Sequence, residues 1–99
     1  MTQESVAQVR IPEGVLYQYL QGETVLLDLV GGVYYGLDSV GTLVWQEIEQ
    51  HGELELVREA LLNEYDVSER QCDKDLRNLV CLLVDKGLLE IVHGDEGTS

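Results

Sequence analysis

The chain has 99 residues, a length that fits one domain with a modest core and needs no disulfide or metal to support it. Six Lys and Arg residues face nineteen Asp and Glu residues, and the formal net charge is -13 at pH 7. Such a charge repels nucleic-acid phosphates and anionic membranes, and it favours basic or neutral partners. Solubility alone accounts for the same charge equally well.

The sequence shows no membrane-spanning segment and no secretory signal. No apolar run approaches the roughly 20 residues that span a bilayer, and residues 1–5 have no basic region leading into an apolar stretch, as a secretory signal would. Cys72 and Cys81 fall on opposite faces of one expected helix, separated by about 13 Å along its axis, which is too far for a disulfide. Two free thiols and no signal predict a cytoplasmic protein.

The first half of the chain predicts a three-stranded antiparallel meander, because three segments are rich in branched and aromatic residues: 15–20, 24–30 and 33–37. Gly31 and Gly32 predict a two-residue hairpin turn between the last two strands. Residues 6–11 alternate apolar with polar side chains and stop at Pro12, so they predict a short extra strand.

The expected hairpin register predicts a sheet that is apolar on both faces. With the two glycines alone in the turn, Val30 opposes Val33 and Leu26 opposes Leu37. A sheet with one solvated face alternates apolar with polar residues, and this one does not. We therefore expect helices, the N-terminal arm or a partner to cover the second face.

From residue 38 onward the apolar spacing becomes helical and predicts three helices. Asp38 or Ser39 is expected to cap the first, which ends at residues 51–52, and the second is expected over residues 53–65. Residues 68–71 match a capping box for the third helix, which ends at Gly87. The inner stripe of this third helix is Cys72, Leu76, Leu79 and Leu83.

These elements predict one α+β domain over residues 1–92, in which a three-stranded antiparallel sheet is followed by three helices in a winged helix-turn-helix-like arrangement. Residues 88–92 predict a short terminal strand, and residues 93–99 predict a disordered tail. A winged-helix DNA-binding regulator is a weak alternative, because the outward face of the third helix mixes acidic with basic residues in a strongly acidic chain.

No residue pattern predicts catalysis, a metal or a cofactor. The potential soft metal ligands form no CxxC or HxxxH pair, and neither histidine is held where a Cys-His hydrolase needs its base. The chain also has no phosphate-binding glycine loop and no calcium-binding loop. We therefore expect a binding protein and not an enzyme.

Several stretches share their order and spacing with a known family: residues 24–29, 32–41, 44–45, 75–76, 79–80, 83 and 87–89. They resemble the PqqD-like family, the peptide-recognition elements of pathways that modify ribosomally made peptides. Asp38 stands where that family usually has Asn, and it preserves helix capping. The Val44-Trp45 pair, the arm at residues 10–12 and the lack of a fused domain look most like the stand-alone recognition proteins of lasso-peptide pathways.

The resemblance implies that the chain binds the leader of a precursor peptide as an added strand on the free edge of residues 33–37, against the third helix. A separate leader peptidase, a cysteine protease, then removes the leader, and an ATP-dependent cyclase closes the lariat. An accessory protein of a radical-SAM enzyme, as in pyrroloquinoline quinone synthesis, is the alternative. The candidate leader-binding residues are Val33, Tyr34, Tyr35, Gly36, Leu37, Cys72, Asp75, Leu76, Leu79 and Leu83. For Leu76 and Leu83, core packing is the simpler explanation.

Overall fold

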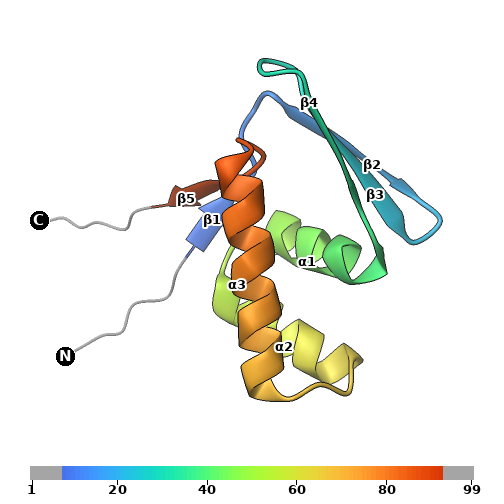
Figure 1. Cartoon of the computed structure of the whole chain (residues 1–99), viewed down its shortest axis with the longest axis vertical. Helices are drawn as coiled ribbons and strands as arrows, with labels where there is room; N and C mark the ends of the chain where they lie inside the picture. Colours follow the sequence, from blue (N-terminus) through green and yellow to red (C-terminus); the bar gives the residue numbers. More distant parts are fainter. Residues whose placement is uncertain (1–7, 93–99) are drawn as a thin grey trace, which may run out of the picture.

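The computed structural model describes residues 8–92 and has the predicted α+β architecture (Figure 1). A three-stranded antiparallel sheet precedes three helices, and a separate two-stranded sheet joins the ends of the described chain. The elements in chain order are β1 (Gln8–Arg10), β2 (Val15–Leu20), β3 (Glu23–Asp28), β4 (Val33–Leu37), α1 (Ser39–Gln50), α2 (Leu54–Glu64), α3 (Glu69–Asp85) and β5 (Glu90–Val92). The expected tail at residues 93–99 lies outside the described residues. None of the helices between residues 8 and 92 is long and apolar enough to cross a bilayer.

The register of the β3–β4 hairpin differs from the prediction by two residues. Leu26 opposes Tyr35, not Leu37, because four residues and not two form the turn. Asp28 stabilises this longer turn: its carbonyl accepts from the Gly32 N–H at 2.8 Å, and its side chain accepts from the Val30 N–H at 3.1 Å. A shift of two residues leaves every strand residue on its predicted face, because side chains alternate with a period of two.

The two faces of the main sheet meet different surroundings. The inner face packs on α1 and contributes Leu26 and Leu37 to the core. On the outer face, Leu16 and Leu20 stay exposed, and Tyr34 is 70% exposed. The expected cover over this second face is therefore missing from residues 8–92.

The core is centred on α1 and the inner face of the sheet. Trp45 is fully buried, and its ring meets the edge of the Tyr17 ring with 5.5 Å between centroids. A hydrogen bond of 2.7 Å between the Thr24 and Thr42 hydroxyls joins β3 to α1 and satisfies both buried groups. Together these contacts fix the sheet on the first helix.

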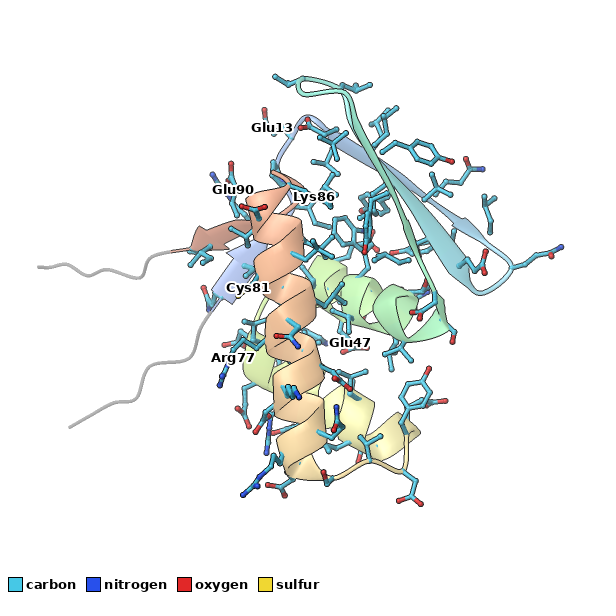
Figure 2. The ribbon with its side chains drawn as sticks, in the orientation of Figure 1. Glu13, Glu47, Arg77, Cys81, Lys86 and Glu90 are labelled. Carbon is cyan, nitrogen blue, oxygen red and sulfur yellow. The ribbon has the colours of Figure 1, made fainter. Side chains whose placement is uncertain are left out.

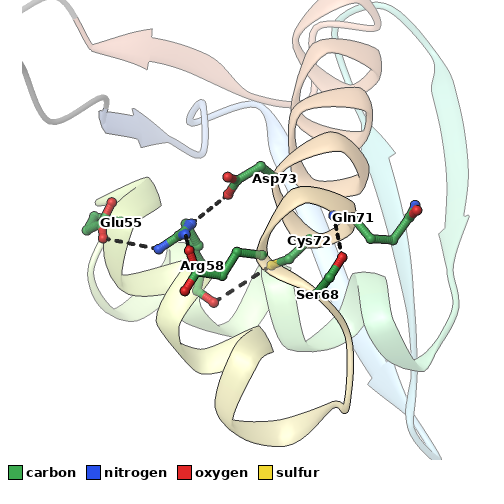
Figure 3. Close-up of polar contacts among 7 residues, drawn as sticks. Glu55, Arg58, Ser68, Gln71, Cys72 and Asp73 are labelled. Atoms are coloured by element: carbon green, nitrogen blue, oxygen red, sulfur yellow. Dashed lines mark hydrogen bonds and ion pairs between the residues drawn. The ribbon is translucent and has the colours of Figure 1, made fainter.

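The helix ends follow the predicted capping, with one exception. Asp38 accepts from the Gly41 N–H at 2.9 Å, and Ser68 accepts from the Gln71 N–H at 3.1 Å (Figure 3). The reciprocal half of the capping box is absent, because the Gln71 side chain donates to Asp75 at 2.8 Å instead of returning to Ser68. The predicted capping box is therefore only half formed.

One side of α3 is fastened to α2 by Arg58, as Figure 3 shows. The Arg58 guanidinium donates to Asp73 at 2.5 Å and to Glu69 at 3.0 Å. The Cys72 thiol lies 3.9 Å from the Arg58 carbonyl oxygen in the same interface. Since α2 occupies this side of α3, another side of the helix remains to face the sheet.

Candidate functional site

The free edge of the main sheet is β4, and no strand within residues 8–92 pairs with its outer side. In an antiparallel ladder, pairs that exchange hydrogen bonds alternate with pairs that do not. The Leu29 N–H donates to the Gly14 carbonyl at 2.9 Å, which continues the β2–β3 ladder by one pair. Counted from Leu29, every second residue of β3 therefore points its backbone N–H and C=O groups toward β2. The residues between them point these groups toward β4, and they are Thr24, Leu26 and Asp28.

Alternation also decides which β4 groups remain free. The three β3 residues that point toward β4 are opposed by Val33, Tyr35 and Leu37. The N–H and C=O groups of these β4 residues therefore point into the sheet. Tyr34 and Gly36 therefore direct their N–H and C=O groups toward the free edge. Such an edge is a template for pairing with another extended chain.

Gly36 lies in the middle of the free edge strand. A glycine within a strand often marks a close approach of another backbone. A Cβ on Gly36 would point to the outer face of the sheet and would meet no atom within 4 Å. Crowding by the described chain therefore does not explain the glycine.

The flank of α3 beside this edge carries four residues spaced by four, three and four positions: Asp75, Leu79, Leu82 and Lys86. At about 100° per residue, this spacing keeps them on one side of the helix. The Lys86 ammonium lies 5.6 Å from the centre of the Tyr35 ring, so this side of α3 faces the inner side of β4. Figure 2 shows Lys86 at the C-terminal end of the helix, and it places Arg77 and Cys81 on the side away from the sheet.

The candidate site residues divide into two groups. Val33, Tyr34, Tyr35 and Gly36 lie on β4 itself, and Asp75 and Leu79 lie on the same side of α3 as Lys86, which reaches Tyr35. Leu37, Cys72, Leu76 and Leu83 have buried side chains, and Leu83 is 0% exposed. The core packing that was the simpler explanation for Leu76 and Leu83 therefore holds, and Cys72 faces α2.

Two residues on the side of α3 that faces β4 escaped the sequence analysis. Leu82 is 37% exposed on the flank that faces β4, although the inner stripe of the helix passes beside it. Lys86 was treated as the helix end, and its contact with Tyr35 comes from the tertiary structure. The spacing of residues 75, 79, 82 and 86 was a signal in the sequence, because it marks a second side of the same helix.

The titratable groups favour anchoring over catalysis. The Tyr17 and Tyr19 hydroxyls both donate to Glu49, at 2.8 and 2.7 Å. The pKa of Tyr17 is raised mainly by its hydrogen bond to Glu49 and then by burial. The pKa of Tyr19 is raised mainly by burial and then by its hydrogen bond to Glu49. The same two hydrogen bonds lower the pKa of Glu49, and the bond from Tyr19 has the larger effect. All three groups keep one protonation state near neutrality, so they tie β2 to α1.

The remaining side chains offer little chemistry beyond hydrogen bonding and apolar contact. Among residues 8–92, no three His, Cys, Asp or Glu side chains gather to hold a metal ion. Burial raises the pKa of the Cys72 thiol, which disfavours the reactive thiolate. A backbone edge beside a partly apolar helix flank is a surface for binding an extended peptide.

The sequence of the sheet and helices matches a family model described as Coenzyme PQQ synthesis protein D (PqqD), over residues 23–89. The chain belongs to the PqqD family. This confirms the resemblance inferred from the strand, turn and helix motifs. No curated protein sequence matches this PqqD-family chain.

Two solved structures share the fold of this PqqD-family chain. TbiB1 in complex with the TbiA(beta) leader peptide is 33% identical, with a TM-score of 0.78, and the match covers 91% of this chain and 98% of TbiB1. A lasso peptide synthetase B1 complexed with the leader peptide is 25% identical, with a TM-score of 0.75 and coverage of 84% and 98%. Both are similar over nearly their whole length, which confirms the predicted fold class.

Proposed function

We propose that this chain binds the leader region of a lasso-peptide precursor as a strand added to β4. The observation that carries the proposal is the free β4 edge, where Tyr34 and Gly36 offer N–H and C=O groups that no strand within residues 8–92 pairs with. Its kinship with two proteins solved with leader peptides supports a leader as the added strand. Main-chain pairing supplies affinity with little demand on the leader's sequence.

In this proposal, a groove between β4 and the Leu79 and Leu82 side of α3 recognises the side chains of the leader. A strand paired with β4 turns every second side chain toward the inner side, where Tyr35, Leu79 and Leu82 provide apolar surface. The eleven steps from Asp75 to Lys86 span about 16 Å of helix axis, and five residues of an extended leader span about the same length. The leader segment that the groove reads is therefore about five residues long.

The bound leader is then presented to a separate enzyme of the same cytoplasmic pathway, with a leader peptidase as the favoured partner. The chain itself contributes binding and no chemical step. The family's description also fits an accessory role beside a radical-SAM enzyme. The lasso pathway is favoured because one of the two solved relatives is a lasso peptide synthetase B1, and both are complexed with a leader peptide.

Calorimetry tests the proposed function directly. The purified chain is titrated with the synthetic leader of the precursor encoded beside it, and with the mature core peptide as the matched control. We expect a dissociation constant in the micromolar range or below for the leader, which corresponds to about 8 kcal/mol, and far weaker binding of the core. The absence of heat with any leader of its gene cluster would refute the function.

A further inference from the structure

The outer face of the main sheet is an apolar surface that the leader edge does not use. Leu16 is 52% exposed, Tyr34 is exposed in the same cross-strand row, and Leu20 is exposed four residues farther along β2. A shallow depression of about 480 Å³ lies on this face, with Leu16, Gln18, Val25, Leu27 and Tyr34 among its lining residues. Apolar side chains contiguous on an exposed face commonly mark an interaction site.

The charge of this face contrasts with that of the molecule. The alternation of side chains puts one charged side chain of the three strands on the outer face, the Glu23 carboxylate, next to the β2–β3 turn. The whole chain carries nineteen acidic residues and six Lys and Arg residues. An apolar centre within a strongly acidic molecule fits a partner that has an apolar contact surface surrounded by basic residues.

A second copy of the chain fits this face poorly, since each copy carries a net charge of -13 and the two would repel. Continuity with the proposed leader site favours a different occupant. Tyr34 belongs to both surfaces, because its side chain lies on the outer face and its backbone lies on the free edge. A leader added to β4 would extend the same sheet, so a protein docked on the outer face would lie next to the leader.

We infer that the outer face of the β2–β3–β4 sheet docks the enzyme that acts on the bound leader, through an apolar patch surrounded by basic side chains on that enzyme. The inference rests on the proposed leader binding and adds the place where the second protein binds. The leader and the enzyme then bind to different surfaces of the chain. The inner side of β4 and α3 hold the leader, and the outer face holds the enzyme.

The test uses the whole chain, the precursor peptide and the leader-removing cysteine protease encoded beside it. Leu16→Glu and Leu20→Glu each put a carboxylate on the outer face, on β2, away from the β4 edge. Val67→Glu is the matched control, because Val67 is an exposed apolar residue in the α2–α3 connection. We expect both outer-face variants to bind the leader within twofold of wild type, and to slow leader removal at least tenfold at limiting protease, while Val67→Glu changes neither.

Two results would overturn the inference while leaving the proposed function intact. The first is leader removal at the wild-type rate with Leu16→Glu and with Leu20→Glu. The second is a wild-type dimer, measured by light scattering, that Leu16→Glu dissociates, because this would assign the face to a second copy. Failure of the wild-type chain to bind the leader at all would refute the proposed function, and the docking inference with it.

Discussion

The two edge strands of the main sheet, β2 and β4, have the same topological position and different surroundings. On β2, Tyr17 and Tyr19 are tied to Glu49 on α1, and the Val15 N–H donates to the Pro12 carbonyl at 3.1 Å. On β4, the Lys86 ammonium over Tyr35 is the contact that reaches across from α3. We propose that β4 and not β2 binds the leader, because α3 faces β4 through Lys86 and Tyr35, whereas β2 is tied to α1.

The largest effect is expected from Gly36→Pro. Proline removes the N–H that Gly36 directs toward the free edge, and it leaves the hydrogen bonds between β3 and β4 in place. An unpaired leader carbonyl costs about 1–3 kcal/mol, so leader affinity should fall about fivefold to 150-fold. Fluorescence anisotropy measures the affinity, and circular dichroism checks the fold.

Gly36→Ala is the matched control for this change. A Cβ at residue 36 meets no atom within 4 Å, so alanine should fold normally and keep its N–H for the leader. If the proline variant folds and binds as tightly as the alanine variant, the leader does not pair with β4, and the β2 edge becomes the next candidate.

Leu79→Asp tests the second wall of the groove. Leu79 is half-buried on the flank of α3 that faces β4, and a carboxylate there is costly to desolvate when a leader covers it. We expect leader binding to weaken at least tenfold, about 1.4 kcal/mol. Cys81→Asp adds the same charge on the exposed, opposite side of α3 and should bind normally. Equal affinities for the two folded variants would place the leader elsewhere.

Lys86→Gln is expected to have a smaller effect at the same site. A cation over an aromatic ring contributes about 0.5–1 kcal/mol at an exposed position. If this contact holds Tyr35 in place for the leader, affinity should fall about twofold to fivefold. Calorimetry resolves a change of this size. An unchanged affinity would mean that the ring keeps its position without the cation.

The smallest effect on binding is expected from Glu49→Gln, which weakens the tie between β2 and α1. Its pKa is lowered in the folded state, so its carboxylate stabilises the fold above its ordinary pKa of 4.5, and this contribution is lost as pH falls through the lowered value. We expect a loss of less than about 1 kcal/mol at pH 7, since the group is exposed to solvent. Urea unfolding should show the difference from wild type shrinking below pH 4.5, with leader affinity unchanged. A constant difference at all pH values would contradict this assignment.

The secondary structure of this protein was predictable because its signals are local. Asp38 and Ser68 cap their helices where the sequence placed them, and Gly87 follows the third helix. The faces of the strands were also correct, because the period of two survives an error in register. The family resemblance depended on the same local motifs and their spacing.

The site depended on contacts that no local pattern contains. The β3–β4 register was wrong because Asp28 bonds two backbone N–H groups of the turn and lengthens it. Likewise, β1 pairs with β5 across some 80 residues, a pairing that no short segment encodes. The sequence by itself determined the elements, their faces and the candidate edge at β4. Only the tertiary structure decided that Cys72 and Leu83 belong to the core while Leu82 stays exposed and Lys86 reaches Tyr35. The physical reason is that the packing of α2 and of the sheet selects which sides of α3 are covered.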